Sequence, residues 1–308
     1  MLGLRGRHCR APTNVRDALA AFRTSVGAPC ATRSTGGHNP ARASSASYRA
    51  HSIPSREDWP RTEKLTLADR ARMLKIVTAP DLPPDGNWDN TAILIDKPLS
   101  FTSFDACALL RKLLGIRKVG HAGTLDPNAT GLLIVCVGKA TKAVDFFQGL
   151  GKAYEGTLRL GESTSSQDAD TPVVESLPWE HITDDDLEAA AASFLGDQLQ
   201  VPPMHSAIRI KGERLYHKAR RGEVVERPPR SIHLDEFSVW RSAGEDANPQ
   251  DVHFRVRCSK GTYVRTLCHD LGAKLGSAAH MTRLRRTAIG SHDVADAWDL
   301  NELRRVLG

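Results

Sequence analysis

The element pattern of this chain predicts an α+β fold with a mixed, mostly antiparallel sheet flanked by helices. Strand and helix signals follow one another without the regular strand–helix–strand alternation that marks a parallel α/β protein. Two long segments, residues 231–240 and 252–258, alternate apolar and polar side chains, which is typical of antiparallel strands with one buried face. The apolar run over 132–137 predicts a further, buried strand.

Local signals predict the remaining elements in order. We expect the folded part to open with a strand over 92–95, followed by a helix that Ser100, Thr102 or Ser103 caps and Gly115 ends. A second helix is expected to start at Thr183, before three aspartates, and to stop at Gly196. The other expected elements are a short helix over about 140–147, a strand over 152–160, a helix from about 262, a basic strand over about 280–286 and a short terminal helix.

Net charge alone does not identify a partner. The chain of 308 residues has a net charge of +6. Residues 1–56 hold 9 Arg, no Lys and one acid, Asp17, for a charge of +8, which leaves 33 basic and 35 acidic residues in the rest. A nucleic-acid groove must therefore be a local basic patch on a body of charge −2. The apolar runs are far too short to cross a bilayer, so no membrane partner is expected.

Residues 1–56 have the composition of an organellar transit peptide, mitochondrial or chloroplast. The segment is rich in Arg, Ala and Ser, poor in acids, and lacks the long apolar core of a secretion signal. Apolar residues over 15–26 recur at helical spacing. A basic tail that touches RNA is the alternative. We expect 1–56 to be disordered, 57–90 to be a polar linker or N-terminal extension, and 91–308 to form the folded domain.

Cysteine spacing predicts neither a metal site nor a disulfide framework. The 6 cysteines form no CxxC pair, and Cys107, Cys136 and Cys258 fall in apolar patterns typical of small core residues. Two superficial motif matches also fail. The segment 138–140 lacks the Ser or Thr of a phosphate-binding loop, and 161–165 lacks the second glycine of a hydrolase elbow.

The segment GHAGTLDPNATG, residues 120–131, carries the strongest functional signal. Its glycines, small hydroxyl residues and proline exclude a helix, and Pro127 holds Asp126 in an extended conformation. A lone Asp-Pro in a loop usually makes a turn in which the carboxylate bonds its own backbone. The long pattern GHxGTLDPxATGxL, however, resembles the catalytic motif of the TruB family of tRNA pseudouridine synthases, in which Asp126 falls on the nucleophile.

Four further segments resemble that family in the same order, over about residues 92–288. ILIDKPLSFTSFD resembles the opening strand and its Lys-Pro turn. KAYEG places Tyr154 on the tyrosine that stacks against the target base, and SKGTYVRTLCHDLG places Tyr263 and Arg265 on an active-site tyrosine and arginine. HMTRLRRTAIG places Leu284 on an apolar residue that lines the uracil pocket.

The resemblance implies a pseudouridine synthase fold with a central active-site cleft, in a catalytic domain over 91–308. It implies an isomerase that converts uridine 55 in the T-loop of tRNA to pseudouridine on a flipped-out base. No cofactor and no metal are expected, because the product is an isomer of the substrate. Asp126 attacks the ribose C1′ or the uracil C6, or assists departure of the uracil on a glycal path, and the sequence leaves these three open. We expect a monomer that acts on the T-arm of tRNA.

Other side chains take supporting roles under this resemblance. Arg265 supplies a fixed positive partner that orients the carboxylate. Tyr154 offers a flat face to the base and a hydroxyl for proton transfer. Tyr263 forms a pocket wall or packs at a helix start, and His121 fills the space that the flipped nucleotide leaves, unless it is a solvated loop residue. Contacts to phosphates, or a merely solvated face, are expected for Lys97, Lys142 and Lys260.

The basic, proline-rich segment over about 200–230 resembles the thumb that TruB enzymes close over the T-loop. Its cations are interleaved with one aromatic residue, which suits the tracking of phosphates, and a plain amphipathic surface helix is the alternative. About twenty residues follow Ala288, too few for the RNA-binding PUA domain of many family members, so we expect the RNA footprint to be confined to the T-arm. The expected thumb contacts are Arg209, Lys211, Arg214, Tyr216, Lys218, Arg220 and Arg221.

A protein that folds tRNA without modifying it would share the thumb and its basic residues. The presence of Asp126, Tyr154 and Arg265 together argues against this alternative, because a chaperone needs no catalytic carboxylate with a fixed cation beside it.

Overall fold

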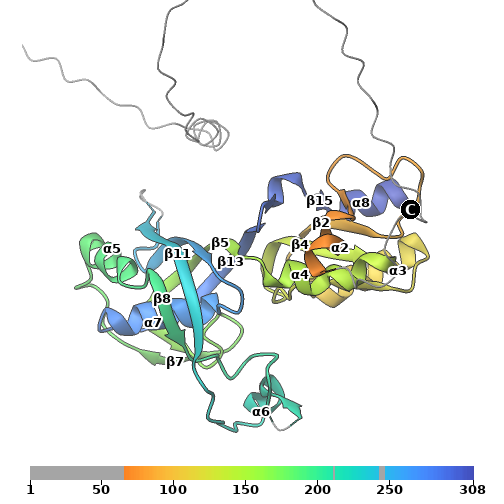
Figure 1. Ribbon diagram of the computed structural model, residues 1–308. Coiled ribbons are helices and arrows are strands. Elements are labelled where there is room, and N and C mark those ends of the chain that lie inside the picture. The colour runs from red at the N-terminus through yellow and green to blue at the C-terminus, as the bar shows by residue number, and fades with distance from the viewer. Residues whose placement is uncertain (1–65, 211, 243–246) are drawn as a thin grey trace, which may run out of the picture. The chain divides into compact units, whose positions relative to one another are not determined.

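The computed structural model describes residues 66–210, 212–242 and 247–308 (Figure 1). These residues form one sheet of 11 strands and two small sheets of 2 strands. Most strand pairs are antiparallel, and the parallel ones are β1–β2, β4–β13 and β2–β15. The predicted α+β class with a mixed, mostly antiparallel sheet is confirmed. The expected transit peptide, 1–56, lies outside the described residues.

The large sheet runs in the order β1-β2-β4-β13-β5-β12-β11-β8, with β3 on β4, β14 on β13 and β15 on β2. Every predicted strand exists, and each gains at least one residue at its ends except 152–160, whose bounds are unchanged. The strands are β1 Lys75–Val77, β2 Thr91–Lys97, β3 Val119–His121, β4 Ala129–Val137, β5 Lys152–Leu160, β6 Glu162–Thr164, β7 Val173–Ser176, β8 Gly196–Gln200, β9 Arg209–Ile210, β10 Glu213–Arg214, β11 Arg230–Arg241, β12 Asp251–Cys258, β13 Ala279–Ile289, β14 His292–Asp293 and β15 Trp298–Asp299.

Two helices begin at the caps that the sequence suggests. Thr102 caps α3. Its hydroxyl accepts a hydrogen bond from the Asp105 backbone N–H, and the Asp105 carboxylate accepts one from the Thr102 backbone N–H. Thr183 caps α5 in the same way, but this helix ends at Ala192, with Ser193 as its C-cap, and Gly196 instead opens β8, so the expected stop at Gly196 is wrong. The helices are α2 Leu67–Arg72, α3 Ser103–Leu114, η2 Gly138–Ala143, α4 Val144–Gly149, α5 Asp184–Ala192, α6 Leu215–Arg220, α7 Val264–Lys274, η3 Val294–Asp296 and α8 Leu300–Leu307.

Part of the expected linker belongs to the sheet. Residues 66–77 form α2 and β1, and β1 pairs in parallel with β2 over three residues. Val77 is 4% exposed and packs in the same apolar cluster as Ile93 and Ile95. The folded domain therefore begins before residue 91, because β1 extends the sheet by one strand.

The sheet has two halves that join at β4 and β13. One half packs β5, β11 and β12 against α5 and α7, and the other packs β2 and β4 against apolar clusters on both faces. The join is a parallel pairing of three residues, from Leu284 opposite Ala129 to Arg286 opposite Gly131. Gly131 has a φ of 104°, and a Cβ there would lie 2.2 Å from the Arg286 carbonyl oxygen, so the join requires glycine.

The thumb, residues 201–229 between β8 and β11, carries the hairpin β9–β10 and the short helix α6. Leu215 at the start of α6 is fully buried, and the backbone N–H groups of Leu215 and Tyr216 donate to the carbonyls of Ile208 and Ser206. The segment is therefore a small folded insertion, of which α6 is one turn and a half.

The described residues contain no helix that is long and apolar enough to span a membrane. Nor do residues 66–210, 212–242 and 247–308 gather three or more His, Cys, Asp or Glu side chains in a group that could hold a metal ion. Cys107, Cys136 and Cys258 are buried free thiols, as is Cys268.

Candidate active site

The Asp126 loop, residues 122–128, connects β3 to β4 and ends at the join of the sheet. The first residue of α3 anchors it: the backbone N–H of Leu125 donates to the Ser103 hydroxyl at 2.9 Å, and that hydroxyl donates to the Leu125 carbonyl at 3.2 Å. The Ala129 N–H donates to the Asp126 carbonyl at 3.0 Å, which closes a turn around Pro127. The loop backbone is thereby fixed, while the Asp126 side chain remains 41% exposed.

Arg265 stands beside Asp126 and is itself held in place. Its Nε lies 3.3 Å from the Asp126 carboxylate, and its side chain is 10% exposed. Nη1 donates to the Asp168 carboxylate at 3.0 Å and to the Ser166 carbonyl at 3.2 Å. Nη2 donates to the His205 carbonyl of the thumb at 2.9 Å. Four groups thus fix the guanidinium plane, so the cation faces Asp126 in one orientation.

Asp168 was not among the predicted site residues. It is 7% exposed, accepts hydrogen bonds from the Ser166 hydroxyl at 2.6 Å and the Asp170 N–H at 3.0 Å, and forms a bridge with Met281 of β13. Burial, with the Asp168 charge beside it, raises the pKa of Asp170, whose carboxylate accepts from the Asn128 amide. The signal was the acid-rich stretch SSQDAD, but its spacing alone does not reveal which carboxylate meets Arg265.

Two buried cations lie behind the Asp126 loop. Lys97 is fully buried, and its ammonium donates to the carbonyls of Pro98, Phe101 and Pro127 at 3.0, 2.6 and 3.3 Å. Burial lowers the pKa of Lys97 to about 8, against the opposing charge of Asp126. The expected phosphate contact of Lys97 is therefore wrong: its ammonium faces backbone carbonyls, and it ties the Asp126 loop to the turn after β2.

Arg286 is the second buried cation, and the sequence did not single it out. It is 1% exposed; its Nε donates to the Leu132 carbonyl at 2.7 Å, and Nη1 and Nη2 donate to the carbonyls of Thr124 and Gly123 at 3.4 and 3.2 Å. No carboxylate of the described residues forms an ion pair with it. Arg286 lies directly opposite Tyr154 on the neighbouring strand, and its charge opposes the burial that raises the pKa of the tyrosine.

A cavity of about 780 Å³ opens beside Asp126. It collects residues from both halves of the sheet, including the predicted Asp126 and Leu284. Its lining is Leu99, Asp126, Asn128, Ala129, Thr130, Glu155, Gly156, Thr157, Asp168, Ala169, Asp170, Trp240, His253, Phe254, Arg255, Met281, Thr282, Arg283, Leu284 and Arg285.

The predicted aromatic site residues are not part of the cavity lining. Tyr154 is 9% exposed and packs with Leu125 and Ala129 behind the loop. Tyr263 caps α7, and its backbone N–H and carbonyl bind the Gln200 amide at 2.8 and 3.0 Å. His121 ends β3, and burial lowers the pKa of its imidazole. Their stacking roles remain predictions.

The two other predicted phosphate contacts are exposed. Lys142 lies on η2 and Lys260 in the turn after β12, and neither lines the cavity. The structure does not bring them together with Asp126.

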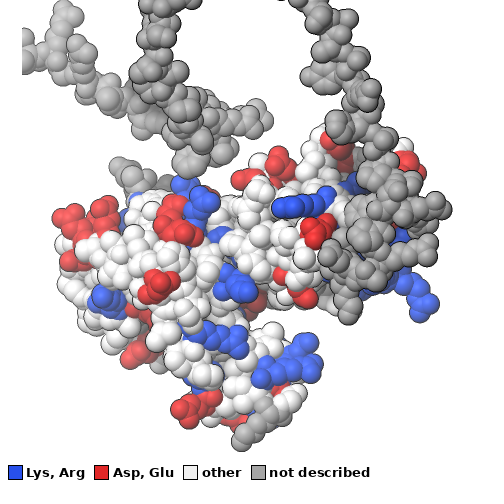
Figure 2. Space-filling view, in the orientation of Figure 1, with Lys and Arg blue, Asp and Glu red and all other residues white. Residues whose placement is uncertain are grey.

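The thumb cations fall into two groups. Arg214 and Arg220 lie near the Tyr216 ring, with their guanidinium carbons 6.0 and 5.7 Å from the ring centroid, and Arg209 is exposed on β9. Arg221 instead binds Glu213 and Glu223 at 2.6 and 2.7 Å, and Lys218 joins both glutamates. Figure 2 shows acidic as well as basic atoms on the lobe that carries α6. Lys211 lies outside the described residues.

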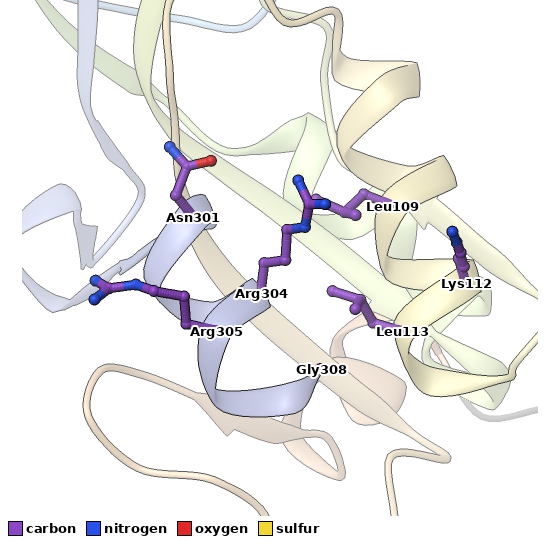
Figure 3. A pocket seen from close by; sticks show the side chains of 7 residues that line it. All are labelled: Leu109, Lys112, Leu113, Asn301, Arg304, Arg305 and Gly308. Atoms are coloured by element: carbon purple, nitrogen blue, oxygen red, sulfur yellow. The ribbon is translucent and has the colours of Figure 1, made fainter.

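A second cavity, of about 500 Å³, lies between α3 and α8 and contains none of the predicted site residues. Figure 3 shows Arg304 reaching toward Leu109 between the two helices, whereas Arg305 points away from α3. The lining is Leu109, Lys112, Leu113, Asn301, Arg304, Arg305 and Gly308. None of its lining side chains carries a carboxylate, so we assign the chemistry to the cavity beside Asp126.

Known proteins match most of the described chain. The model of the TruB family pseudouridylate synthase N-terminal domain matches residues 111–264, and that of the tRNA pseudouridylate synthase B C-terminal domain matches 265–307. The tRNA pseudouridine synthase B of Opitutus terrae is 50% identical over 211 residues, which cover 68% of this chain and 86% of that protein. The Streptococcus pneumoniae serotype 4 protein of the same name is 46% identical over 215 residues, covering 70% of this chain and 74% of that protein.

A solved structure agrees with these matches. A chain of a Cbf5–Nop10–Gar1 complex superposes with a TM-score of 0.56 and 28% identity, over 74% of this chain and 58% of that one. The fold, the motif around Asp126 and the sequence relatives therefore lead to one assignment. This chain belongs to the TruB family of pseudouridylate synthases.

Proposed function

We propose that the protein is a tRNA pseudouridine synthase that isomerises uridine 55 in the T-loop to pseudouridine. The observation that carries the proposal is the ion pair of Asp126 with Arg265 at the edge of the large cavity. Its support is the family itself, in which relatives 50% and 46% identical to this chain bear the name tRNA pseudouridine synthase B.

The reaction needs a carboxylate that is fixed, ionised and close to the ribose. Asp126 supplies it, from a loop that Ser103, Lys97 and Arg286 hold to the body of the protein. Arg265 presents a positive charge to the carboxylate and is preorganised by Asp168, so little reorganisation is needed when charge develops during the reaction. Attack at C1′, attack at C6 and the glycal path all use the carboxylate in this position.

The uracil leaves the base stack to reach Asp126. Leu284 supplies an apolar wall for the flipped base, and Tyr154 lies next to the loop with its hydroxyl on the side of Arg286. The exposed cations of the thumb, Arg209, Arg214 and Arg220, lie outside any internal ion pair of the described residues and suit phosphates of the T-arm. The enzyme works as a monomer, which light scattering of the free protein tests.

The deciding experiment incubates the full chain with unmodified tRNA transcripts in the absence of added cofactor and maps pseudouridine chemically. Pseudouridine is expected at position 55, at the same rate with and without a chelator. A transcript with cytidine at position 55 is the control and should stay unmodified. Modification confined to another stem, or none with the intact protein, contradicts the proposal.

We also propose that residues 1–56 direct the protein into an organelle, mitochondrion or chloroplast, and are then removed. The support is their composition, with 9 Arg, no Lys and one acid. Mass spectrometry of the native N-terminus checks this. A protein that starts at Met1 or Leu2 and fractionates with the cytosol contradicts it.

A further inference from the structure

The cavity beside Asp126 extends well beyond the reacting groups. One row of directly opposed residues crosses four neighbouring strands: Arg283 on β13, Thr157 on β5, His253 on β12 and Trp240 on β11. All four line the cavity. Because strands lie about 4.8 Å apart, Trp240 stands roughly 10 Å from the strand that carries Thr157. The row thus leads away from β4, the strand that follows the Asp126 loop, along one face of the sheet.

This face is not the one that forms the core. Phe237, Val239 and Phe254 alternate with the row and are buried against α5 and α7. Trp240, by contrast, is 45% exposed, the only tryptophan of the described residues with so much of its surface open. The core packs on the other face of the sheet, so the exposed part of the Trp240 indole is open to a partner.

The His253 ring beside it is fixed. Its Nδ1 lies 3.2 Å from the Thr157 hydroxyl, and its Nε2 is hydrogen-bonded to the Ser242 hydroxyl. The Trp240 and His253 ring centroids are 6.0 Å apart, with an angle of 35° between the planes. Two polar contacts therefore fix the His253 ring, and the Trp240 ring lies beside it at an angle. The pair presents a preformed aromatic surface.

Two arginines of β13 and β12 line the same cavity as this pair. Arg283 is exposed and forms no ion pair within the described part of the chain. Arg255, two residues after His253, binds Glu155 at 2.7 Å and remains half exposed. An aromatic surface beside a cation is the arrangement that binds unpaired nucleotides, because a base stacks on the rings while its phosphate meets the charge.

We propose that Trp240 and His253 form a stacking shelf for a second unpaired base of the RNA substrate, distinct from the uridine that reacts at Asp126. The Arg283 guanidinium contacts the sugar-phosphate backbone of the same RNA strand. The shelf strengthens RNA binding and leaves the chemical step unchanged, since no atom of it touches the reacting groups. This inference rests on the proposed RNA substrate.

The experiment compares the full-length protein with Trp240→Ala, Trp240→Phe and Leu199→Ala. Leu199 is the matched control, a 75% exposed apolar residue of β8 that does not line the cavity. We expect Trp240→Ala to weaken binding of unmodified tRNA about tenfold, as for the loss of one stacked base. The single-turnover rate at saturating tRNA should stay within about twofold of wild type, since that contact makes no part of the chemical step. Trp240→Phe should recover most of the affinity, and Leu199→Ala should bind as the wild type does.

Two further measurements locate the base and protect the test from misfolding. Tryptophan emission of the wild type should be quenched by tRNA, and Trp240→Phe should lose that quenching. Single abasic sites in the T-loop should include one, away from position 55, that weakens wild-type binding but not binding by Trp240→Ala. Unchanged affinity of Trp240→Ala, or abasic effects equal in both proteins, overturns the shelf. If the wild type forms no pseudouridine at all, the proposed function has failed instead.

Discussion

The Asp126 loop and the thumb both depend on basic side chains, and they use them in opposite ways. Lys97, Arg286 and Arg265 are buried, and they donate to backbone carbonyls and to Asp168. The thumb arginines are exposed, and those that are bound face glutamates of the thumb itself. A buried cation with many acceptors fixes geometry, whereas an exposed one carries charge that salt can screen.

This difference separates two functions within one enzyme. Positions behind the loop should govern rate and stability, and positions on the thumb should govern RNA affinity and its dependence on salt. Five predictions test that division, from the largest expected effect to the smallest.

Asp126→Asn removes the charge and hardly changes the shape. We expect turnover to be abolished while tRNA affinity stays within a few-fold of wild type, because phosphate contacts dominate binding. Single-turnover assays and filter binding measure the two quantities. A parallel loss of both would identify Asp126 as a structural turn residue.

Arg265→Lys keeps a positive charge but lacks the planar fork that reaches Asp126, Asp168 and two carbonyls together. The rate should fall by roughly 10²-fold, the scale for loss of one preorganised electrostatic group. Arg265→Ala should be slower still, because no cation remains. Equal rates for the Lys and Ala variants would contradict a role for the charge.

Arg286→Met removes the donor to three backbone carbonyls, and the one of fully buried Leu132 has no solvent to replace it. The free energy of unfolding should fall by about 3 kcal/mol. Arg220→Met on the thumb is the control and should change it by less than about 0.5 kcal/mol. Denaturant titration measures the free energy of unfolding of both variants. A similar loss in both would contradict the distinction between the Asp126 loop and the thumb.

Lys97→Met has a pH-dependent effect on stability. The pKa of Lys97 is about 8 in the folded protein and 10.5 when unperturbed, so between these values the unfolded chain binds more protons. The contribution of Lys97 to stability therefore rises with pH across that window. The loss on substitution should be larger at pH 10 than at pH 7, by roughly 2 kcal/mol.

Thermal or denaturant unfolding at both pH values checks this difference. Lys142→Met, at an exposed lysine, should show no such dependence. A Lys97→Met loss that is the same at pH 7 and pH 10 would mean that the ammonium is not desolvated.

The smallest effect concerns the two groups of thumb arginines. Arg220→Ala should lower the slope of log affinity against log salt by about 1, as for one lost phosphate contact. Arg221→Ala should leave that slope nearly unchanged, because Arg221 binds Glu213 and Glu223. Equal changes in slope would show that those ion pairs open when RNA binds.

The sequence predicted the elements and the Asp126–Arg265 pair, and it failed where a role depends on burial. Periodicity reveals a strand, and a long motif reveals a family, so β5, β12, Asp126 and Leu284 were found. The exposure of Lys97 was predicted wrongly, because a lysine next to a proline suggests an exposed turn. In the structure the turn after β2 buries this side chain.

Asp168 and Arg286 were missed for a related reason. Their partners lie 97 and more than 150 residues away in the chain, so no local spacing connects them. Only the pairing of β13 with β4 and β5 brings Arg286 to the loop and to Tyr154.

Because β4 and β13 join over only three residues, the distance between Asp126 and Arg265 depends on how the two halves of the sheet are arranged. Asp126 enters from the β4 side, and Arg265 is carried by α7 on the other side. A small rotation of one half against the other changes the 3.3 Å separation of Arg265 and Asp126 directly, because the two residues come from the two sides of that join. Substitutions in either core, far from any nucleotide, are therefore expected to change the reaction rate before they unfold the protein.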